Sequence, residues 1–381
     1  MSLPFLPFAQ PWFDEATITG VADVMRSRWV ASGPWVQRLE QDLSSYLGGR
    51  PVRVMTSATA ALEIALRIAG VGPGDEVITC AMSFFASVNM IGRVGATPVF
   101  VDCEPSTRNI DLDQVERCIG PRTRAILPTH FAGLPCDMDR LYDIARRHRL
   151  RVIEDAALAI GSSWRGQRIG AFGDLICFSF HPNKNMTTIE GGALVVNDDA
   201  EALAAERWRF HGIERLPDGT RDVGIAGLKA NMPDVHARVG VAQLAMLEEF
   251  NRRRRELVRR YFAKFNTLPA CELPHPGHAG DEDGHSWNMF ALLLPLDRLR
   301  IDRPQFIAAM RDRGIGIGVS YEALHLSRLA RSEWGGAPGQ HPHAEHVART
   351  TVTLPLFYAM QDGDVDRVCA AVAEVLAGGA A

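Results

Sequence analysis

The chain has 381 residues, of which 46% are hydrophobic and 23% are charged, as is usual for a globular protein with a sizeable core. Its 41 basic and 45 acidic residues give a net charge of −4, which argues against a nucleic-acid partner because phosphate binding needs a basic surplus. Seven cysteines without a C-x-x-C pair argue against a disulfide framework or a zinc ribbon. With no signal-peptide pattern and no apolar run of membrane-spanning length, we expect a cytoplasmic protein without a membrane partner.

Apolar runs alternate with helix-period segments between about residues 50 and 200. The pattern predicts helices over 58–69, 84–94, 112–119 and 138–148, separated by strands over 76–80, 98–101, 125–128 and 152–153. Strands that alternate with helices form βαβ units, so the predicted fold class is α/β, with a mostly parallel sheet between two layers of helices. Two more strands, over 175–180 and 193–196, follow without a helix between them.

The C-terminal part of the chain has a different pattern. It predicts a long helix over 233–265, a strand over 289–294, and helices near 304–313 and 364–377. We therefore expect a large domain of residues 1–248, which carries the parallel sheet, and a smaller α+β domain of residues 249–381.

Lysine is rare in this chain, because only Lys184, Lys229 and Lys264 are lysines among the 41 basic residues. Lys184 lies in the segment SFHPNKNMTTIEGG (179–192), a polar turn that follows an apolar strand. A lysine amine that is partly removed from water loses its proton more readily and can form a Schiff base. A surface lysine in a turn is the alternative, but the apolar flanks and the rarity of lysine favour a catalytic role.

Two further segments contain the polar residues of a ligand site. Asp155 ends the strand in RVIEDAA (151–157), and ligands of open α/β sheets bind at the carboxyl ends of strands. A helix N-cap is an equally supported alternative for this aspartate. In TSATAAL (56–62), small hydroxyl residues open a helix whose free amides can bind a phosphate, although an ordinary Ser/Thr N-cap has the same pattern.

These segments together supply the parts of a pyridoxal phosphate site. The turn at 56–62 would hold the phosphate, Lys184 would bind the aldehyde as an imine, and Asp155 would keep the ring nitrogen protonated. Ser179 adds a hydroxyl at the end of a strand. A protonated ring accepts the electrons released when a Cα proton leaves, so the combination indicates pyridoxal phosphate as the cofactor.

Several segments, taken in order, resemble the DegT/DnrJ/StrS family of pyridoxal phosphate-dependent nucleotide-sugar aminotransferases. They include GPGDEVIT (72–79), GATPVFVD (95–102), PRTRAILPTHFAG (121–133), VIEDAA (152–157), GLKANMPDVHARVGVAQL (227–244) and TLPLF (353–357). The resemblance covers nearly the whole chain and implies fold type I, the aspartate aminotransferase fold. It is greatest for the enzymes that aminate UDP-4-keto-pentoses and UDP-4-keto-hexoses.

The resemblance also implies roles for the residues that match the family motifs. It implies that Lys184 forms the Schiff base and moves protons, that Asp155 partners the pyridine nitrogen, and that Phe84 stacks on the cofactor. The residues that match the family's phosphate contacts are Ala58, Thr59 and Ser179.

Three residues are expected at the rim of the site. Asn231, in KANM, matches a residue that reaches the phosphate of the neighbouring subunit, which implies a homodimer with shared active sites. His325, in YEALH, matches a motif near the substrate pocket. Lys229 is placed to meet a sugar-nucleotide phosphate or, as an equal alternative, to form a structural salt bridge.

Two residues depart from the family pattern. Leu158 replaces the Gln or His that contacts the cofactor's phenolic oxygen, and an apolar side chain cannot make that hydrogen bond. Ile189 replaces the glycine that usually precedes EGG. Both changes affect the expected substrate more than the expected cofactor.

The resemblance implies an enzyme that moves an amino group from L-glutamate to a nucleotide-linked 4-keto or 3-keto sugar. A keto-cyclitol or another natural-product ketone is an alternative acceptor, and Leu158 leaves room for a non-transaminating reaction. A non-catalytic sensor or scaffold of the same fold is less favoured, because it needs neither Lys184 nor Asp155. The histidines of HPHAEH (341–346) have no partner cysteine, so we expect no metal site.

Overall fold

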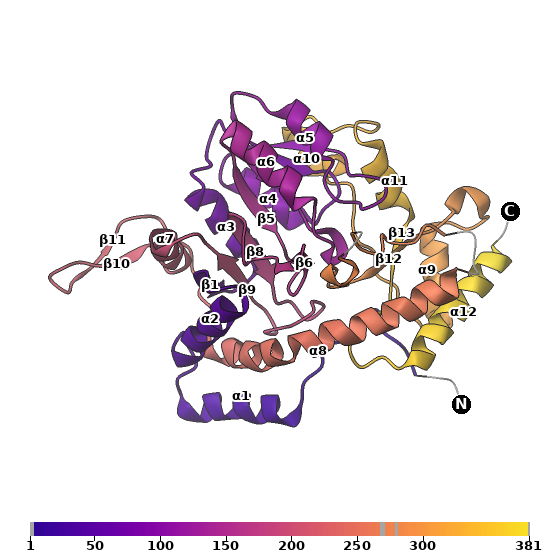
Figure 1. Cartoon of the computed structure of the whole chain (residues 1–381), viewed down its shortest axis with the longest axis horizontal. Coiled ribbons are helices and arrows are strands. Elements are labelled where there is room, and N and C mark those ends of the chain that lie inside the picture. Colours follow the sequence, from indigo (N-terminus) through magenta and orange to yellow (C-terminus); the bar gives the residue numbers. More distant parts are fainter. Residues whose placement is uncertain (1–3, 267–270, 279–280, 380–381) are drawn as a thin grey trace.

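A seven-stranded sheet forms the centre of the computed structural model, which describes residues 4–266, 271–278 and 281–379 (Figure 1). Its strand order is β1-β9-β8-β5-β4-β2-β3. In chain order the strands are β1 (Val52–Met55), β2 (Glu76–Cys80), β3 (Thr97–Val101), β4 (Thr123–Leu127), β5 (Arg151–Asp155), β8 (Leu175–Ser179) and β9 (Gly192–Val195). Within this sheet β9 is antiparallel to both neighbours and the other pairs are parallel, so the predicted mostly parallel sheet is confirmed.

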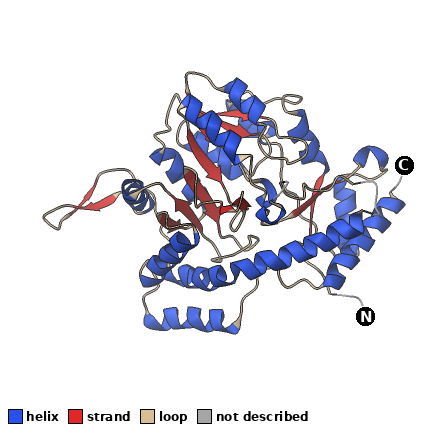
Figure 2. Ribbon diagram, in the orientation of Figure 1, coloured by secondary structure: helices blue, strands red, loops and turns tan. Residues whose placement is uncertain are grey.

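Helices cover both faces of this sheet (Figure 2). One face packs against α3 (Ala58–Ile68), α4 (Phe85–Arg93) and α7 (Asp199–Arg209). The opposite face packs against α2 (Pro34–Tyr46), α5 (Leu112–Cys118) and α6 (Met138–His148). Adjacent residues of one strand pack into the cores on opposite faces of the sheet. Val152 and Ile153 of β5, for example, belong to different core clusters. This two-sided burial explains why the strands are continuous apolar runs in the sequence.

Helix α8 (Asp234–Phe265) is 32 residues long and runs along the base of the molecule (Figure 1). One end packs against α1 (Glu15–Ser27) and α2, and the other end packs against α12 (Asp362–Gly378). Leu247 of α8 belongs to the core under the sheet, whereas Leu257 belongs to a second core. Residue 248, the predicted domain boundary, therefore lies inside a continuous helix between its contacts with two cores, and the division there stays a prediction.

The second core is built from C-terminal elements. They are the antiparallel strands β12 (Phe290–Leu293) and β13 (Thr351–Leu354), with α9 (Arg303–Asp312) and α12. Shorter helices in this part are α10 (Arg328–Glu333) and α11 (Pro342–Thr350), with single turns η1 (Phe131–Gly133), η2 (Glu282–Gly284), η3 (Leu296–Arg298) and η4 (Leu324–Leu326) elsewhere. Two small hairpins join β6 (Ser163–Trp164) to β7 (Gln167–Arg168) and β10 (Ile213–Arg215) to β11 (Arg221–Val223). The β10–β11 hairpin projects away from the rest of the molecule (Figure 1).

Each helix and strand predicted from the sequence is present, with ends that differ by at most two residues. The pattern did not predict α1, α2, α7 or β1. Helix α7 shows why, because it buries only Ala202, Ala205 and Arg209 and so lacks a clear apolar stripe. No helix in the described part of the chain is long and apolar enough to cross a membrane.

Candidate active site

The carboxyl ends of the parallel strands open into a cavity of about 360 Å³, which we call the cofactor cavity. A space of this size suits a small-molecule ligand. The structure brings together here six of the residues that the sequence singled out: Ala58, Thr59, Phe84, Asp155, Ser179 and Lys184. Other polar residues that line the cavity are Ser57, Thr129, His181, Asn183, Glu190 and Tyr321.

Lys184 lies in the loop that joins β8 to β9. Its backbone N–H donates to the carbonyl of His181 at 2.9 Å, which closes a turn at the end of the strand. Burial of the amine lowers the pKa of Lys184 to about 8, although the nearby Asp155 carboxylate opposes this effect. The amine therefore loses its proton more readily than that of an exposed lysine, and about a tenth of it is neutral and nucleophilic at pH 7, as suits a Schiff-base lysine.

Asp155 is the last residue of β5 and is almost completely buried. Its Oδ2 accepts a hydrogen bond of 2.6 Å from the hydroxyl of Ser87, and its Oδ1 accepts one of 3.2 Å from the N–H of Ala157. Burial raises the pKa of this carboxyl, whereas the two hydrogen bonds and the positive charge of Lys184 lower it. The carboxylate is thus held at a strand end, where it can bind a protonated ring nitrogen.

The opposite wall of the cavity is the N-terminus of α3. Ser57 caps this helix, since its hydroxyl accepts from the N–H of Ala60 at 3.1 Å. The amides of Ala58 and Thr59 lie in the first turn, where backbone N–H groups and the helix dipole attract an anion. Ser179, at the end of β8, supplies a hydroxyl to the same cavity. This end of the cavity therefore fits a phosphate group.

Gly192 lets the sheet approach this helix end. A Cβ at Gly192 would lie 2.4 Å from the backbone nitrogen of Ala58 and 2.8 Å from the carbonyl oxygen of Phe178. Real side chains do not approach backbone atoms so closely, so only glycine fits at the start of β9. The second glycine of the EGG segment thus has a packing role at the phosphate end of the site.

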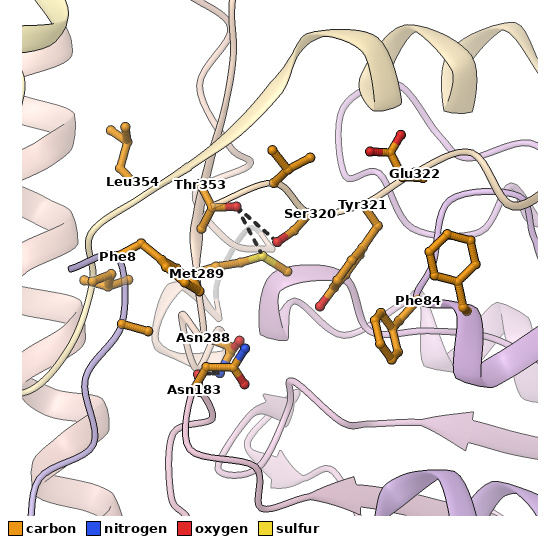
Figure 3. Close-up of a pocket in the computed structure, with 14 residues that line it drawn as sticks. Phe8, Phe84, Asn183, Asn288, Met289, Ser320, Tyr321, Glu322, Thr353 and Leu354 are labelled. Carbon is orange, nitrogen blue, oxygen red and sulfur yellow. Dashed lines mark hydrogen bonds between the residues drawn. The ribbon is translucent and has the colours of Figure 1, made fainter. Parts of the chain in front are cut away.

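A second cavity of about 260 Å³ adjoins the first, and we call it the antechamber. The two cavities share Phe84, Asn183 and Tyr321. The rings of Phe84 and Tyr321 lie 5.8 Å apart, with Glu322 further along the same wall (Figure 3). Opposite them, the Asn288 amide donates to the carbonyl oxygen of Asn183 at 3.3 Å. The antechamber therefore combines aromatic surfaces with amide and carboxylate groups.

Asn231 and Lys229 do not line the cofactor cavity of their own chain. The Lys229 amine donates to Asn231 Oδ1 and lies 5.1 Å from the centre of the Phe210 ring. The Asn231 amide donates to the hydroxyl of Ser32 at 2.6 Å. Lys229 thus contacts Asn231 and Phe210 and forms no salt bridge with the described residues, and its contact with a sugar-nucleotide phosphate stays a prediction.

His325 is completely buried and lines neither cavity. Its Nε2 lies 3.0 Å from Glu345 Oε1, and its ring packs against His341 at 4.6 Å between ring centres. The structure therefore does not support the predicted contact between His325 and a substrate. The side chain instead joins η4 to α11 behind the wall of the antechamber.

The two departures from the family pattern both lie at the cofactor cavity. Leu158 is buried and lines it, so an apolar side chain occupies a place where a hydrogen-bonding one was expected. Ile189 precedes Glu190, which lines the cavity, and has a φ of 72° with 43% of its surface exposed. A β-branched residue in this left-handed region is an outlier, because its Cβ crowds the backbone.

Several residues of the site are not apparent from the sequence. Thr129 lies two residues after the end of β4, so the rule that ligands bind at strand ends, which identified Asp155, could have identified it too. Tyr321 lies in the same YEALH segment as His325, and the wrong member of that segment was singled out. Glu322 belongs to the same segment, whereas Asn288 carries no local signal, because only the tertiary fold brings it to the antechamber.

A model of the DegT/DnrJ/EryC1/StrS aminotransferase family matches residues 11–373 of the chain. Among solved structures, the chain is similar to Spr1654 of Streptococcus pneumoniae, named as a sugar aminotransferase, in its pyridoxal phosphate form (31% identity, TM-score 0.90, 99% of both chains). It is also similar to DesV of S. venezuelae in complex with a ketimine intermediate (33% identity, TM-score 0.89, 98% of both chains). PseC of Helicobacter pylori, an aminotransferase of pseudoaminic acid biosynthesis, is 25% identical (TM-score 0.89, 98% of this chain and 100% of that one).

Proposed function

Since the chain belongs to the DegT/DnrJ/EryC1/StrS aminotransferase family, we propose that it moves an amino group from L-glutamate to a nucleotide-linked keto-sugar. The predicted family, the fold of pyridoxal phosphate-dependent aminotransferases and the cofactor are confirmed. The observation that carries the proposal is the position of the Lys184 amine, which shares one cavity with Asp155 and the N-terminus of α3.

The residues of the cofactor cavity fit pyridoxal phosphate at both of its ends. The first-turn amides of α3 and the hydroxyl of Ser179 can hold the phosphate, and Asp155 can hold the proton of the ring nitrogen. When bound, the cofactor supplies an aldehyde that an amine can bind and a ring that accepts electrons from Cα. In its neutral form the Lys184 amine can bind that aldehyde. When the amine of the amino donor replaces the Lys184 amine, the freed Lys184 amine can move a proton from the donor's Cα.

The sugar acceptor is proposed from the relatives and from the antechamber. Spr1654 is named as a sugar aminotransferase, and PseC takes part in pseudoaminic acid biosynthesis. The rings of Phe84 and Tyr321 offer apolar faces to the C–H surface of a sugar. Asn183, Asn288 and Glu322 offer donors and acceptors to its hydroxyl groups.

A homodimer with shared active sites is part of this proposal. Asn231 lies outside the cofactor cavity of its own chain, on a surface that also includes Trp29, which is 60% exposed. The Asn231 amide donates to the hydroxyl of Ser32, which lies three residues after Trp29 in the chain. Large exposed aromatic side chains beside a polar anchor are typical of a protein interface. A second copy of the chain that covers this surface would bring Asn231 to the partner's cavity.

We propose that the protein works in the cytoplasm, because free cysteines are typical of proteins in a reducing compartment. All seven cysteines are free in the structure, and most of them are buried. Burial raises the pKa of thiols such as Cys80, which makes them poor nucleophiles. Proteins that work in oxidising compartments use cysteines as disulfides instead.

An acceptor without a nucleotide is the second candidate, and the charge of the antechamber favours it. Among the described residues that line this cavity, Glu322 is the charged one and none is cationic. Because the Glu322 carboxylate pairs with Arg303 at 3.4 Å and no described residue that lines the cavity is cationic, a diphosphate would find no basic partner there, whereas an uncharged keto-cyclitol needs none. Competition between the ketone acceptor and UDP or dTDP alone separates the two candidates. Inhibition by a nucleoside diphosphate supports the nucleotide-linked substrate, and its absence supports the free ketone.

The visible absorption spectrum of the purified protein tests the proposed reaction. We expect bound pyridoxal phosphate to give a band that L-glutamate converts to the pyridoxamine form, with release of 2-oxoglutarate. Lys184→Ala should bind the cofactor without a covalent bond and should not release 2-oxoglutarate at a measurable rate. Lys264→Ala is the matched control, because Lys264 lies in α8 and pairs with Asp366.

Each result bears on a different part of the proposal. A band that glutamate leaves unchanged, with every other amino donor tried as well, would reject transamination and leave Leu158 as the first residue to examine. A protein that binds no pyridoxal phosphate at all would reject the cofactor assignment.

A further inference from the structure

Three buried hydroxyl groups form a row that ends at Asp155. The Ser87 hydroxyl lies 2.6 Å from Asp155 Oδ2. The Ser83 hydroxyl lies 3.1 Å from that of Ser87, and 2.7 Å from that of Thr129. All four side chains are buried. Ser87 lies in the first turn of α4 and Ser83 just before it, whereas Thr129 and Asp155 lie at the ends of neighbouring strands.

The direction of these hydrogen bonds follows from the number of protons available. An ionised carboxylate has no proton to give, so Ser87 must donate to Asp155. A hydroxyl has one proton, so Ser87 must accept from Ser83, and Ser83 must in turn accept from Thr129. The three O–H dipoles therefore all point toward the carboxylate. Hydrogen bonds arranged in such a chain strengthen one another by about 10–30% each.

Asp155 needs this support because of where it lies. Burial favours the neutral form of its carboxyl group, and a neutral carboxyl could not hold a positively charged ring. Of its two hydrogen bonds within the chain, the one from Ser87 at 2.6 Å is much shorter than the one from the Ala157 amide at 3.2 Å. Short bonds to a charged acceptor are the stronger ones. The hydroxyl row is thus the main local source of hydrogen bonding that favours the ionised form.

We propose that Thr129, Ser83 and Ser87 form a one-way hydrogen-bond chain that positions Asp155 and keeps it ionised against the ring nitrogen of the cofactor. This inference rests on the proposed function, because it needs pyridoxal phosphate in the cofactor cavity. Ser83 becomes a positioning residue, although it neither bonds to Asp155 nor lines the cavity. A weakened chain would raise the proton affinity of the Asp155 carboxylate, so that Asp155 would hold a protonated ring nitrogen less firmly.

Ser87→Ala, Ser83→Ala and the double variant test the chain by two measurements. The first is the Kd of pyridoxal phosphate for the apoenzyme by calorimetry, and the second is the ¹⁵N shift of ring-labelled cofactor bound to the protein. We expect Ser87→Ala to weaken binding about tenfold and to move the ¹⁵N signal toward the unprotonated value. Ser83→Ala should have the same effect at about threefold, because it acts only through Ser87. The double variant should match Ser87→Ala alone, since the chain is already broken there.

Ser162→Ala is the matched control, because Ser162 is a fully buried serine whose hydroxyl donates to the Gly133 carbonyl instead. Ser87→Thr keeps a hydroxyl at this position, so both the Kd and the ¹⁵N shift should be close to those of the wild-type protein. This variant can be measured even if the alanine variant does not fold. A Ser83→Ala result equal to that of the control, or additive losses in the double variant, would overturn the proposal. If the wild-type protein itself binds no pyridoxal phosphate, the proposed function fails instead, and the two failures are distinct.

Discussion

The cofactor cavity and the antechamber are neighbouring spaces with different construction. The walls of the cofactor cavity include strand ends, the first turn of α3 and the loop between β8 and β9, and Lys184 and Asp155 are held there by backbone and by buried hydrogen bonds. The walls of the antechamber include the loop that carries Tyr321 and Glu322, together with residues from β13 and the N-terminal segment. Backbone and buried hydrogen bonds give precise positions at the first cavity, whereas a surface loop such as the one at the second cavity tolerates substitution. The difference indicates that chemistry is set at the first cavity and acceptor choice at the second.

Among the variants considered, Asp155→Asn is expected to cause the largest loss of activity, because Asp155 lies in the cofactor cavity. An amide cannot stabilise a protonated ring, so kcat/KM should fall by about 10³ for the amino donor and for the acceptor alike. Steady-state kinetics of both half-reactions measure this. If only one half-reaction were slowed, the assignment of the chemistry of both half-reactions to the cofactor cavity would be wrong.

Gly192→Ala tests the packing at the phosphate end of the cofactor cavity. The added Cβ would crowd the Ala58 nitrogen, so the free energy of unfolding should fall by about 1–3 kcal/mol. Denaturant unfolding of the apoenzyme measures the change. Gly363→Ala in α12 is the control, because a Cβ there would meet no atom within 4 Å, and it should be neutral or stabilising.

The capture of pyridoxal phosphate by the apoenzyme should depend on pH through Lys184. Burial lowers the pKa of this amine to about 8, and the neutral amine is the reactive form. The rate of covalent capture should therefore rise about tenfold between pH 7 and pH 9 and level off above it. Stopped-flow absorbance follows this rate. A rate that keeps rising beyond pH 10 would show an amine without the expected burial.

Glu322→Gln is expected to have the smallest effect on the kinetics. It tests whether the antechamber affects the acceptor without affecting the cofactor. Loss of the negative charge should change KM for the ketone acceptor by about three- to tenfold, through altered hydrogen bonds to its hydroxyl groups. The spectrum of the bound cofactor and the reaction with the amino donor should not change. Glu333→Gln, on an exposed helix end outside both cavities, is the matched control. An altered cofactor spectrum would contradict a division of roles between the cavities.

Much of the cofactor cavity could be predicted from the sequence, and little of the antechamber. Lys184 and Asp155 follow buried strands, and strand ends of a parallel sheet converge wherever the chain places them. Tyr321 and Asn288 both line the antechamber because the fold brings the segment before β12 and the loop before β13 to one place, and the pairing of β12 with β13 is a long-range contact without a local signal. The hydrogen bond from Ser87 to Asp155 was out of reach for the same reason, since residues distant in sequence meet at adjacent elements. His325 was expected at the substrate pocket from its place in a motif, but its side chain is buried outside both cavities. A position in a motif does not reveal which way the side chain points.

Ile189 has a consequence for engineering this protein. A non-glycine residue in the left-handed region carries about 1–2 kcal/mol of conformational strain, and this side chain is too exposed for packing within its own chain to offset it. Glycine or asparagine at this position would relieve the strain and raise the melting temperature. Because Ile189 precedes Glu190 of the cofactor cavity, the rate of turnover measured on the stabilised variant would show whether the strained turn contributes to the reaction.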